Sequence, residues 1–252
     1  MSSIVTNIAM ADATRVIVRG RDLVNDLIGK HSFTEIFYFL ICERFPTPGE
    51  TRVLDACLVT LMEHGFTPAA VISRIMDESV PDQIQVSIAS GLLTIGNVHA
   101  GTMEGCAALL SEGVKATNQD VWLMEKLSHF RERKKPVPGF GHKMHKPDDP
   151  RTKPLLEVAR ANQLEGPHVQ LLLKMSKKID EAAGKHITIN ATGALAALLL
   201  EIGIAPSIVR AIAVVSRCAG LVGHILEEKK TTSSRVIINK AREAIPYVDP
   251  SS

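Results

Sequence analysis

The chain of 252 residues is long enough to bury a core, either as one large domain or as two small ones. Hydrophobic residues make up 45% and charged residues 22%, as in ordinary soluble proteins, and the low aromatic content of 4% favours helices over strands. A formal net charge of +2 argues against a general nucleic-acid-binding protein, which would carry a basic face.

The cysteines and the apolar segments indicate in which cellular compartment the protein is expected. The four cysteines are scattered without a Cys-x-x-Cys pair, so we expect buried free thiols and neither a metal knuckle nor a redox pair. The N-terminus lacks a basic segment followed by a long apolar run, and Glu201, Pro206 and Arg210 interrupt the apolar stretch 191–215. We therefore expect a cytoplasmic protein with no membrane partner.

The first predicted element is a strand at 15–20, and only helices follow it. Ser32 with Glu35 forms a capping box, and Thr47 followed by a proline begins the next helix in the same way. This second helix should run to residues 63–64, with Gly65 in a left-handed conformation at its end. Further helices are expected at 69–77, 83–95, 103–114, 120–133, 154–161, 168–183, 190–202, 206–228 and 234–243. The predicted class is all-α.

The stretch "GFGHKMHKPDDPR", from Gly139 to Arg151, concentrates polar and titratable side chains in a loop that contains glycines and prolines. It lacks the third glycine and the preceding strand of a dinucleotide-binding fingerprint. His142 and His145 with Asp149 are metal-ligand types, but their loop spacing is weak evidence, and no metal is expected. A glycine-flanked histidine nine residues before an arginine can instead place a proton-transfer group beside an anion-binding group.

Other histidines and arginines fall outside ordinary surface patterns. His99 lies in a glycine-punctuated break between two helices, where a structural role and a role at a ligand are about equally supported. His64 stands at a helix end. Arg217 lies in an otherwise apolar helix, so it must either find an anion or reach solvent, and Arg235 follows after a polar link. Together these residues indicate a small polyanionic ligand, because guanidinium groups pair bidentately with carboxylates.

These stretches together resemble the citrate synthase superfamily, over nearly the whole chain and in the family's order. "GFGHKMHKPDDPR" is similar to its Gly-x-Gly-His loop followed by Asp-Pro-Arg, and "GNVHAG" is similar to its Gly-Pro-Leu-His-Gly-Gly turn. "MEHG" and "SRCAGLVGHILEE" resemble its earlier histidine and its C-terminal arginine helix. The shortened N-terminal part resembles stand-alone citryl-CoA lyases and the lyase module of ATP-citrate lyase.

The resemblance implies a citrate-synthase-like fold and a homodimer that acts on a CoA thioester and a di- or tricarboxylate, without nucleic acid. A large helical domain (1–101 and 213–252) would carry a smaller one on the CoA side (102–212). The implied roles are as follows: His142 at the C2 oxygen of oxaloacetate, His99 at the thioester oxygen, His64, Arg151, Arg217 and Arg235 at carboxylates, and Gly139, Gly141 and Lys143 at the coenzyme. The family's last arginine crosses from the partner subunit.

Thr192 departs from the family, whose catalytic aspartate occupies this place in an Asn-x-Asp-Gly-like turn. A hydroxyl cannot exchange the acetyl methyl proton near neutral pH as a carboxylate can. A water or Glu104 could substitute for it, or the substrate could differ. Three hypotheses therefore stay open: a citryl-CoA-lyase-like enzyme, a citrate-synthase-type enzyme with another acyl-CoA or keto acid, and a weakly catalytic protein that binds CoA thioesters. A metal-dependent enzyme is a distant fourth.

Overall fold

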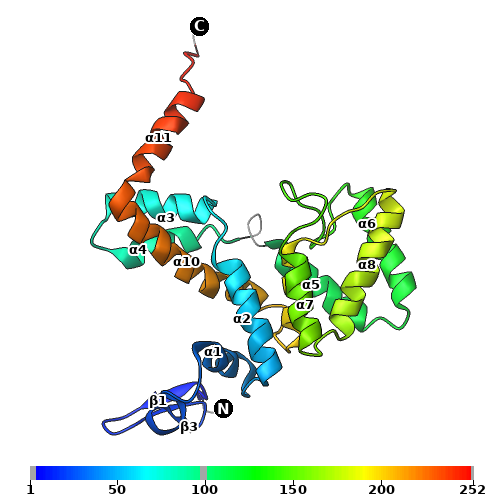
Figure 1. The fold of residues 1–252 in the computed structure, drawn as a ribbon, viewed down its shortest axis with the longest axis horizontal. Coiled ribbons are helices and arrows are strands. Elements are labelled where there is room, and N and C mark those ends of the chain that lie inside the picture. Colours follow the sequence, from blue (N-terminus) through cyan, green and yellow to red (C-terminus); the bar gives the residue numbers. More distant parts are fainter. Residues whose placement is uncertain (1–3, 97–100, 251–252) are drawn as a thin grey trace.

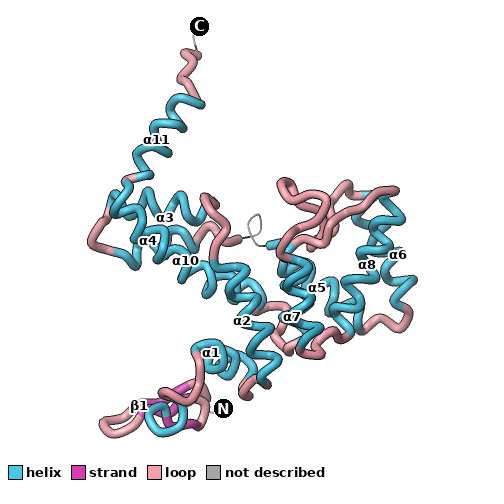
Figure 2. The backbone as a smooth tube through the Cα atoms, viewed as in Figure 1, coloured by secondary structure: helices cyan, strands magenta, loops and turns pink. Residues whose placement is uncertain are grey.

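The computed structural model describes residues 4–96 and 101–250, and helices dominate it, as predicted (Figures 1 and 2). The helices are α1 (Phe33–Cys42), α2 (Pro48–Met62), α3 (Pro68–Ser79), α4 (Ile84–Leu92), α5 (Gly101–Val114), α6 (Gln119–Glu132), α7 (Thr152–Ala161), α8 (Pro167–Ala183), α9 (Ala191–Glu201), α10 (Val209–Thr231) and α11 (Ser233–Ala244). The boundaries predicted for the last nine of these helices agree with the observed ones to within three residues.

A small sheet near the N-terminus differs from the prediction of a single strand. Strands β1 (Ala9–Ala11), β2 (Val16–Val18) and β3 (Arg21–Asp22) pair antiparallel in that order, and a five-residue π-helix, Leu23–Leu27, follows. The outer strands are too short to show alternation of polar and apolar residues. The β1–β2 turn is held by Asp12, whose carboxylate accepts backbone N–H bonds from Thr14 and Arg15.

Capping boxes begin the next two helices, as the sequence predicts. Ser32 and Glu35 exchange side-chain-to-backbone hydrogen bonds at the start of α1, and Thr47 and Glu50 do the same at α2. Helix α2 ends at Met62, slightly earlier than expected, and Gly65 adopts its left-handed φ of +69° only three residues later.

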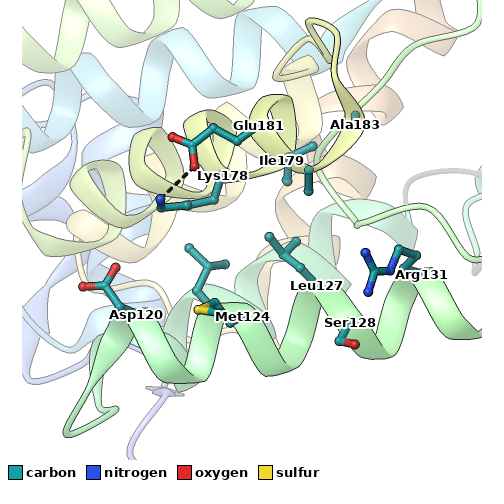
Figure 3. Close-up of a pocket in the computed structure, with 11 residues that line it drawn as sticks. Asp120, Met124, Leu127, Ser128, Arg131, Lys178, Ile179, Glu181 and Ala183 are labelled. Atoms are coloured by element: carbon teal, nitrogen blue, oxygen red, sulfur yellow. Dashed lines mark hydrogen bonds and ion pairs between the residues drawn. The ribbon is translucent and has the colours of Figure 1, made fainter.

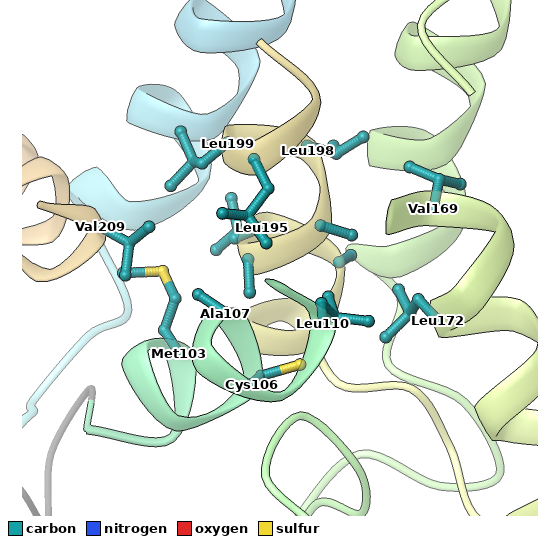
Figure 4. Close-up of a cluster of buried hydrophobic side chains, with 14 of the residues drawn as sticks. Met103, Cys106, Ala107, Leu110, Val169, Leu172, Leu195, Leu198, Leu199 and Val209 are labelled. Carbon is teal, nitrogen blue, oxygen red and sulfur yellow. The ribbon is translucent and has the colours of Figure 1, made fainter. Parts of the chain in front are cut away.

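Helix α9 lies at the centre of the hydrophobic core. Every residue from Gly193 to Leu200 is buried, so the helix is apolar on all sides, which is typical of an interior helix. Figure 4 shows Leu195, Leu198 and Leu199 between side chains of α5, such as Met103 and Leu110, and side chains of α8, such as Leu172. Helices α5, α7 and α8, together with α2, thus pack around one buried helix, α9.

Helix α2 joins this group to the remaining helices. It contacts α7 and α9 on one side and α10 on the other, while α10 also packs against α3 and α4 (Figure 1). By length and composition α10 could cross a membrane, which is weak evidence because core helices pass the same test. It begins three residues later than expected because Ala205 and Ile208 close a turn before it. Thr232, in a left-handed conformation, separates α10 from α11, which projects from the body.

Candidate active site

The loop from Gly139 to Arg151 is held against the start of α9 by close backbone contact. Gly139 has a φ of +87°, and a Cβ atom there would lie 2.6 Å from Cys106 Sγ and 2.9 Å from the Cα of Gly193. Gly141, with φ +78°, donates its N–H to the carbonyl of Thr188, and Asn190 Nδ2 donates to the carbonyl of Gly141 at 2.8 Å. Glycine is required at both positions, by the left-handed backbone at each and by the close packing at Gly139.

His142, the next residue, is fixed in one tautomer by its own loop. Its Nδ1 accepts backbone N–H bonds from Met144 at 3.1 Å and from His145 at 2.9 Å. Because Nδ1 is an acceptor, the proton of the neutral ring lies on Nε2. Burial, followed by the neighbouring charge of His145, lowers the pKa of His142, so the neutral form dominates at neutral pH. His142 therefore offers one defined N–H donor.

Two more imidazoles lie beside it and complete a histidine cluster of His64, His142 and His145. The rings of His142 and His145 are stacked with centroids 4.3 Å apart, and His64 meets His145 edge-on at 5.9 Å. One ring nitrogen from each residue lies within 4.8 Å of the other two, which makes this a group that could hold a metal ion. Burial, followed by the charge of Arg151, lowers the pKa of His64 as well.

Arg151 lies next to the cluster in a fixed orientation. Its Nε and Nη2 bond to Asp149 Oδ1 and Oδ2 at 2.9 and 2.8 Å, which is bidentate pairing. Burial would raise the pKa of the Asp149 carboxyl, but Arg151 and the N–H of Ala191 hold it at about 2. Since Asp149 also bonds to the start of α9, the aspartate links the loop, the guanidinium and the helix.

Glu63 joins the end of α2 to α10 on the other side of the cluster. Its Oε1 accepts the N–H groups of His64 and Gly65, each at 2.7 Å, and lies 3.5 Å from Arg217 Nη1. Its Oε2 lies 3.0 Å from His224 Nε2. Arg217 has therefore found an anion, which is one of the two outcomes that the sequence allows, and burial lowers its pKa. The same carboxylate fixes both the backbone of His64 and the guanidinium.

Thr192 occupies the first turn of α9, opposite α5. Its hydroxyl donates to Asn190 Oδ1 at 2.7 Å and lies 3.1 Å from the hydroxyl of Thr102. Asn190 is the N-cap and also accepts the N–H of Gly193. Glu104, the other acid considered for proton transfer, forms an ion pair with Arg210 of α10. Its carboxylate is thus bonded to a guanidinium.

Among the predicted site residues that the structure describes, Arg235 and Lys143 are not brought to the cluster. Arg235 lies on α11, where its side chain is 71% exposed and bonds to Glu78 at 2.5 Å. His99 lies outside the described residues. Lys143 is exposed on the loop next to His142. The structure therefore assembles His64, His142, Arg151 and Arg217, with Thr192 at the adjoining end of α9.

Sequence reasoning missed the place of His145 in this cluster and the linking role of Glu63. The sequence offered His145 only as a weak metal-ligand candidate. Nothing in the loop sequence shows that the backbone folds back so that its N–H groups bond to Nδ1 of His142. Glu63 could have been found, since an acidic residue directly after a helix and before His-Gly can accept the free N–H groups that follow it.

A groove between α6 and α8, of about 780 Å³, lies elsewhere (Figure 3). It is lined by apolar side chains such as Met124, Leu127 and Ile179, with Asp120 and Arg131 towards its two ends. None of its lining residues belongs to the histidine cluster, so the groove is not the candidate active site.

Comparison with known proteins shows which family this chain matches. Residues 42–240 match the family described as "Citrate synthase, C-terminal domain". Citrate synthase 2 of Bacillus subtilis is 27% identical over 202 residues, which are 79% of this chain and 52% of that protein. The chain spans about half or less of the length of the curated relatives that head this comparison.

Among solved structures, citryl-CoA lyase from Hydrogenobacter thermophilus superposes with a TM-score of 0.83 at 31% identity. The match covers 90% of this chain and 88% of that one. ATP citrate lyase of Methanosaeta concilii, solved with (3S)-citryl-CoA, gives a TM-score of 0.82 at 20% identity over 99% of this chain and 42% of its own, which shows the fold alone. Since the family match spans most of the chain, the protein belongs to the citrate synthase C-terminal domain family.

Proposed function

We propose that this protein is a citryl-CoA-lyase-like enzyme that reversibly cleaves citryl-CoA, or a related 3-hydroxy-3-carboxyacyl-CoA, to acetyl-CoA and oxaloacetate or another 2-oxo acid. The observation that carries the proposal is the match to the Hydrogenobacter citryl-CoA lyase, which covers nearly all of both chains. The curated synthases, in contrast, match over 58% of their length or less.

The site supports this chemistry through its donors. Cleavage breaks the bond between C3 of citryl-CoA and the acetyl carbon: the C3 hydroxyl gives up its proton and becomes the carbonyl of the keto acid, and the acetyl carbon becomes an enolate. One proton is then added to the enolate carbon, which balances the proton that the hydroxyl released and gives acetyl-CoA. The Nε2–H of His142, whose Nδ1 accepts two backbone N–H groups, would hydrogen-bond the oxygen that changes between hydroxyl and carbonyl. His64, Arg151 and Arg217 would hold carboxylates, while His99 would donate to the thioester oxygen.

The coenzyme and a second subunit complete the proposal. Lys143 is exposed beside His142 and would meet the CoA thioester together with the Gly139–Gly141 turn. Arg235 would act at the site of another copy in a homodimer. The smaller domain, 102–212, would carry the coenzyme side, and we propose a cytoplasmic location.

Two alternatives have specific support. The names of the curated relatives, mostly citrate synthases with a 2-methylcitrate synthase among them, favour a synthase-type enzyme with another acyl-CoA or keto acid. The hydroxyl at Thr192 and the pairing of Glu104 favour a protein that binds CoA thioesters with little turnover.

Ligand-induced thermal shifts and an activity assay separate the three hypotheses. Citrate, oxaloacetate, CoA, acetyl-CoA and citryl-CoA are tested one at a time, and a ligand at one hundred times its Kd should stabilise the fold by about 2.7 kcal/mol. Acetyl-CoA release from citryl-CoA is then measured for wild type and for His142→Ala, which should lose it. Stabilisation by CoA thioesters without release would favour the binding protein, and release of a different product pair would favour the synthase-type enzyme.

A further inference from the structure

We propose that His145 is a third substrate-contacting imidazole, whose ring nitrogen donates to an oxygen of the 2-oxo acid part of the substrate. The inference rests on the proposed function and extends it, because neither the sequence motifs nor the comparisons assign a role to this residue. It is carried by geometry: an unpartnered ring nitrogen, its convergence with two other imidazoles, and the charges around them.

The first observation is the state of His145 itself. Its Nε2 is buried and has no hydrogen-bond partner among the described residues. Nitrogens of this kind in protein interiors are almost always paired, either with the protein or with something bound to it. The ring is also held in place, since it stacks on His142, and its backbone N–H bonds to that ring. A fixed ring with an unused nitrogen is suited to receive a ligand atom.

The second observation is the spacing of the three rings. One nitrogen from each of His64, His142 and His145 lies within 4.8 Å of the other two. An oxygen about 2.9 Å from each of two nitrogens can bridge a separation of up to roughly 5.8 Å. A metal ion bound at about 2.1 Å needs nitrogens no more than roughly 4.2 Å apart. Separations within 4.8 Å therefore admit a hydrogen-bonded oxygen as they stand, and the choice between an oxygen and a metal rests on the groups around the rings.

The third observation is the set of hydrogen-bond donors around the rings. The guanidinium groups of Arg151 and Arg217 both act on His64, and each is paired with a carboxylate, Arg151 with Asp149 and Arg217 with Glu63. A guanidinium has five N–H donors and no acceptor, so the donors that these carboxylates leave over suit an anionic ligand and not a metal cation. A short 2-oxo dicarboxylic acid meets both conditions, since its carboxylate and carbonyl oxygens are acceptors and its carboxylates carry the negative charge.

His145→Phe and His145→Gln test this role, with oxaloacetate and citrate as probes in calorimetric titrations in the presence of EDTA. Phenylalanine keeps a flat ring that can stack on His142 but has no nitrogen, whereas glutamine keeps a hydrogen-bonding amide. We expect His145→Phe to weaken oxaloacetate binding about tenfold or more and His145→Gln to recover part of the loss. CoA binding should stay within about twofold of wild type in both, which shows that the fold is intact.

Unchanged oxaloacetate and citrate binding in His145→Phe would overturn the inference, and so would binding by wild type that EDTA abolishes and Zn²⁺ restores. His142→Ala separates this failure from failure of the proposed function. If His142→Ala loses oxaloacetate while His145→Phe keeps it, the proposed function stands and the role of His145 is wrong. If wild type binds neither oxaloacetate nor citrate, both are wrong.

Discussion

At the start of α9, the side chain at the place where the sequence resemblance predicts a carboxylate is a hydroxyl engaged with its neighbours. Thr192 donates to Asn190 Oδ1 and lies next to the hydroxyl of Thr102. The first turn of a helix favours a negative charge, because its free N–H groups give it a positive end. A carboxylate at position 192 should therefore be tolerated by the fold, and its absence bears on the chemistry.

Replacing Thr192 by aspartate should raise the turnover of citryl-CoA. A positioned general acid–base typically contributes ~10²–10⁴-fold, and the gain should leave ligand affinity little changed because it belongs to the transition state. The measurement is the rate of acetyl-CoA release by wild type, Thr192→Asp and Thr192→Asn, since asparagine has a similar size without the base. Fast wild-type cleavage that falls in the aspartate variant would show that another residue already fills the role.

Local sequence motifs singled out several residues of this site, but the contacts between distant parts of the chain could not be predicted from them. Arg217 could be singled out because a charge in an apolar helix needs an anion, and Glu63 is that anion. The contact of His145 with His142 depends on a backbone turn that no residue pattern encodes. The substrate roles of His64, Arg151 and Lys143 stay predictions.

At the scale of elements, helix ends were predictable where side chains cap them, as at Ser32 and Thr47. The small sheet could not be predicted from the sequence, because strands of two or three residues are stabilised only by their pairing with one another.

The close packing of α10 against α2 could not be predicted from the sequence either. At Gly220 of α10, a Cβ atom would lie 2.0 Å from the carbonyl oxygen of Met62, so α10 crosses directly over the end of α2 that carries Glu63.

Gly220→Ala should therefore destabilise the protein, while Gly223→Ala on the same helix should not. The first forces α10 away from α2, and overpacking of this kind costs ~1–3 kcal/mol. The second meets nothing within 4 Å, and alanine is favoured over glycine in a helix by roughly 1 kcal/mol. Free energies of unfolding from urea titration give both values. Equal effects at the two glycines would mean that the α2–α10 contact is not tight.

The active-site loop is also tied to the segment between α8 and α9 by a histidine between two carboxylates. His186 Nδ1 lies 2.8 Å from Asp180, and its Nε2 lies 2.8 Å from Asp148 of the loop. Both ring nitrogens can donate only when the imidazole is protonated. Hydrogen bonds that the imidazole donates to Asp180, and then to Asp148, accordingly raise the pKa of His186.

Because the folded-state pKa is raised, His186 stabilises the folded protein fully at pH values below the unfolded pKa of about 6.5. This contribution to the free energy of unfolding is lost as the pH rises through the folded-state pKa. Wild type should therefore have a higher Tm than His186→Gln below the unfolded pKa, and the two Tm values should converge at alkaline pH, above the raised folded pKa. Lys185→Gln, at the exposed neighbouring position, is the control and should not show this pH dependence. A Tm difference that stays constant with pH would contradict the ionic bridge.

At the scale of the whole molecule, α11 and the residues after it have few contacts within the chain. The side chain of Arg235 bonds to Glu78 on α3, and α11, which carries it, projects from the body (Figure 1). Beyond α11, Ile245 and Tyr247 are 78% and 82% exposed. Exposed apolar side chains in the same C-terminal segment as Arg235 suit an interface with a second subunit. The homodimer and the division at residues 102–212 stay predictions.

If Arg235 acts at the site of its partner, two inactive variants should complement each other. In an exchanged equal mixture of Arg235→Ala and His142→Ala, half of the dimers are hybrids, and each hybrid has one intact site. Roughly a quarter of wild-type activity should therefore return. Mixing His142→Ala with Arg151→Ala is the matched control, because both residues lie beside the same cluster and no hybrid site is intact. Citryl-CoA cleavage after subunit exchange gives the answer, and recovery in neither mixture, or equally in both, would refute the shared site.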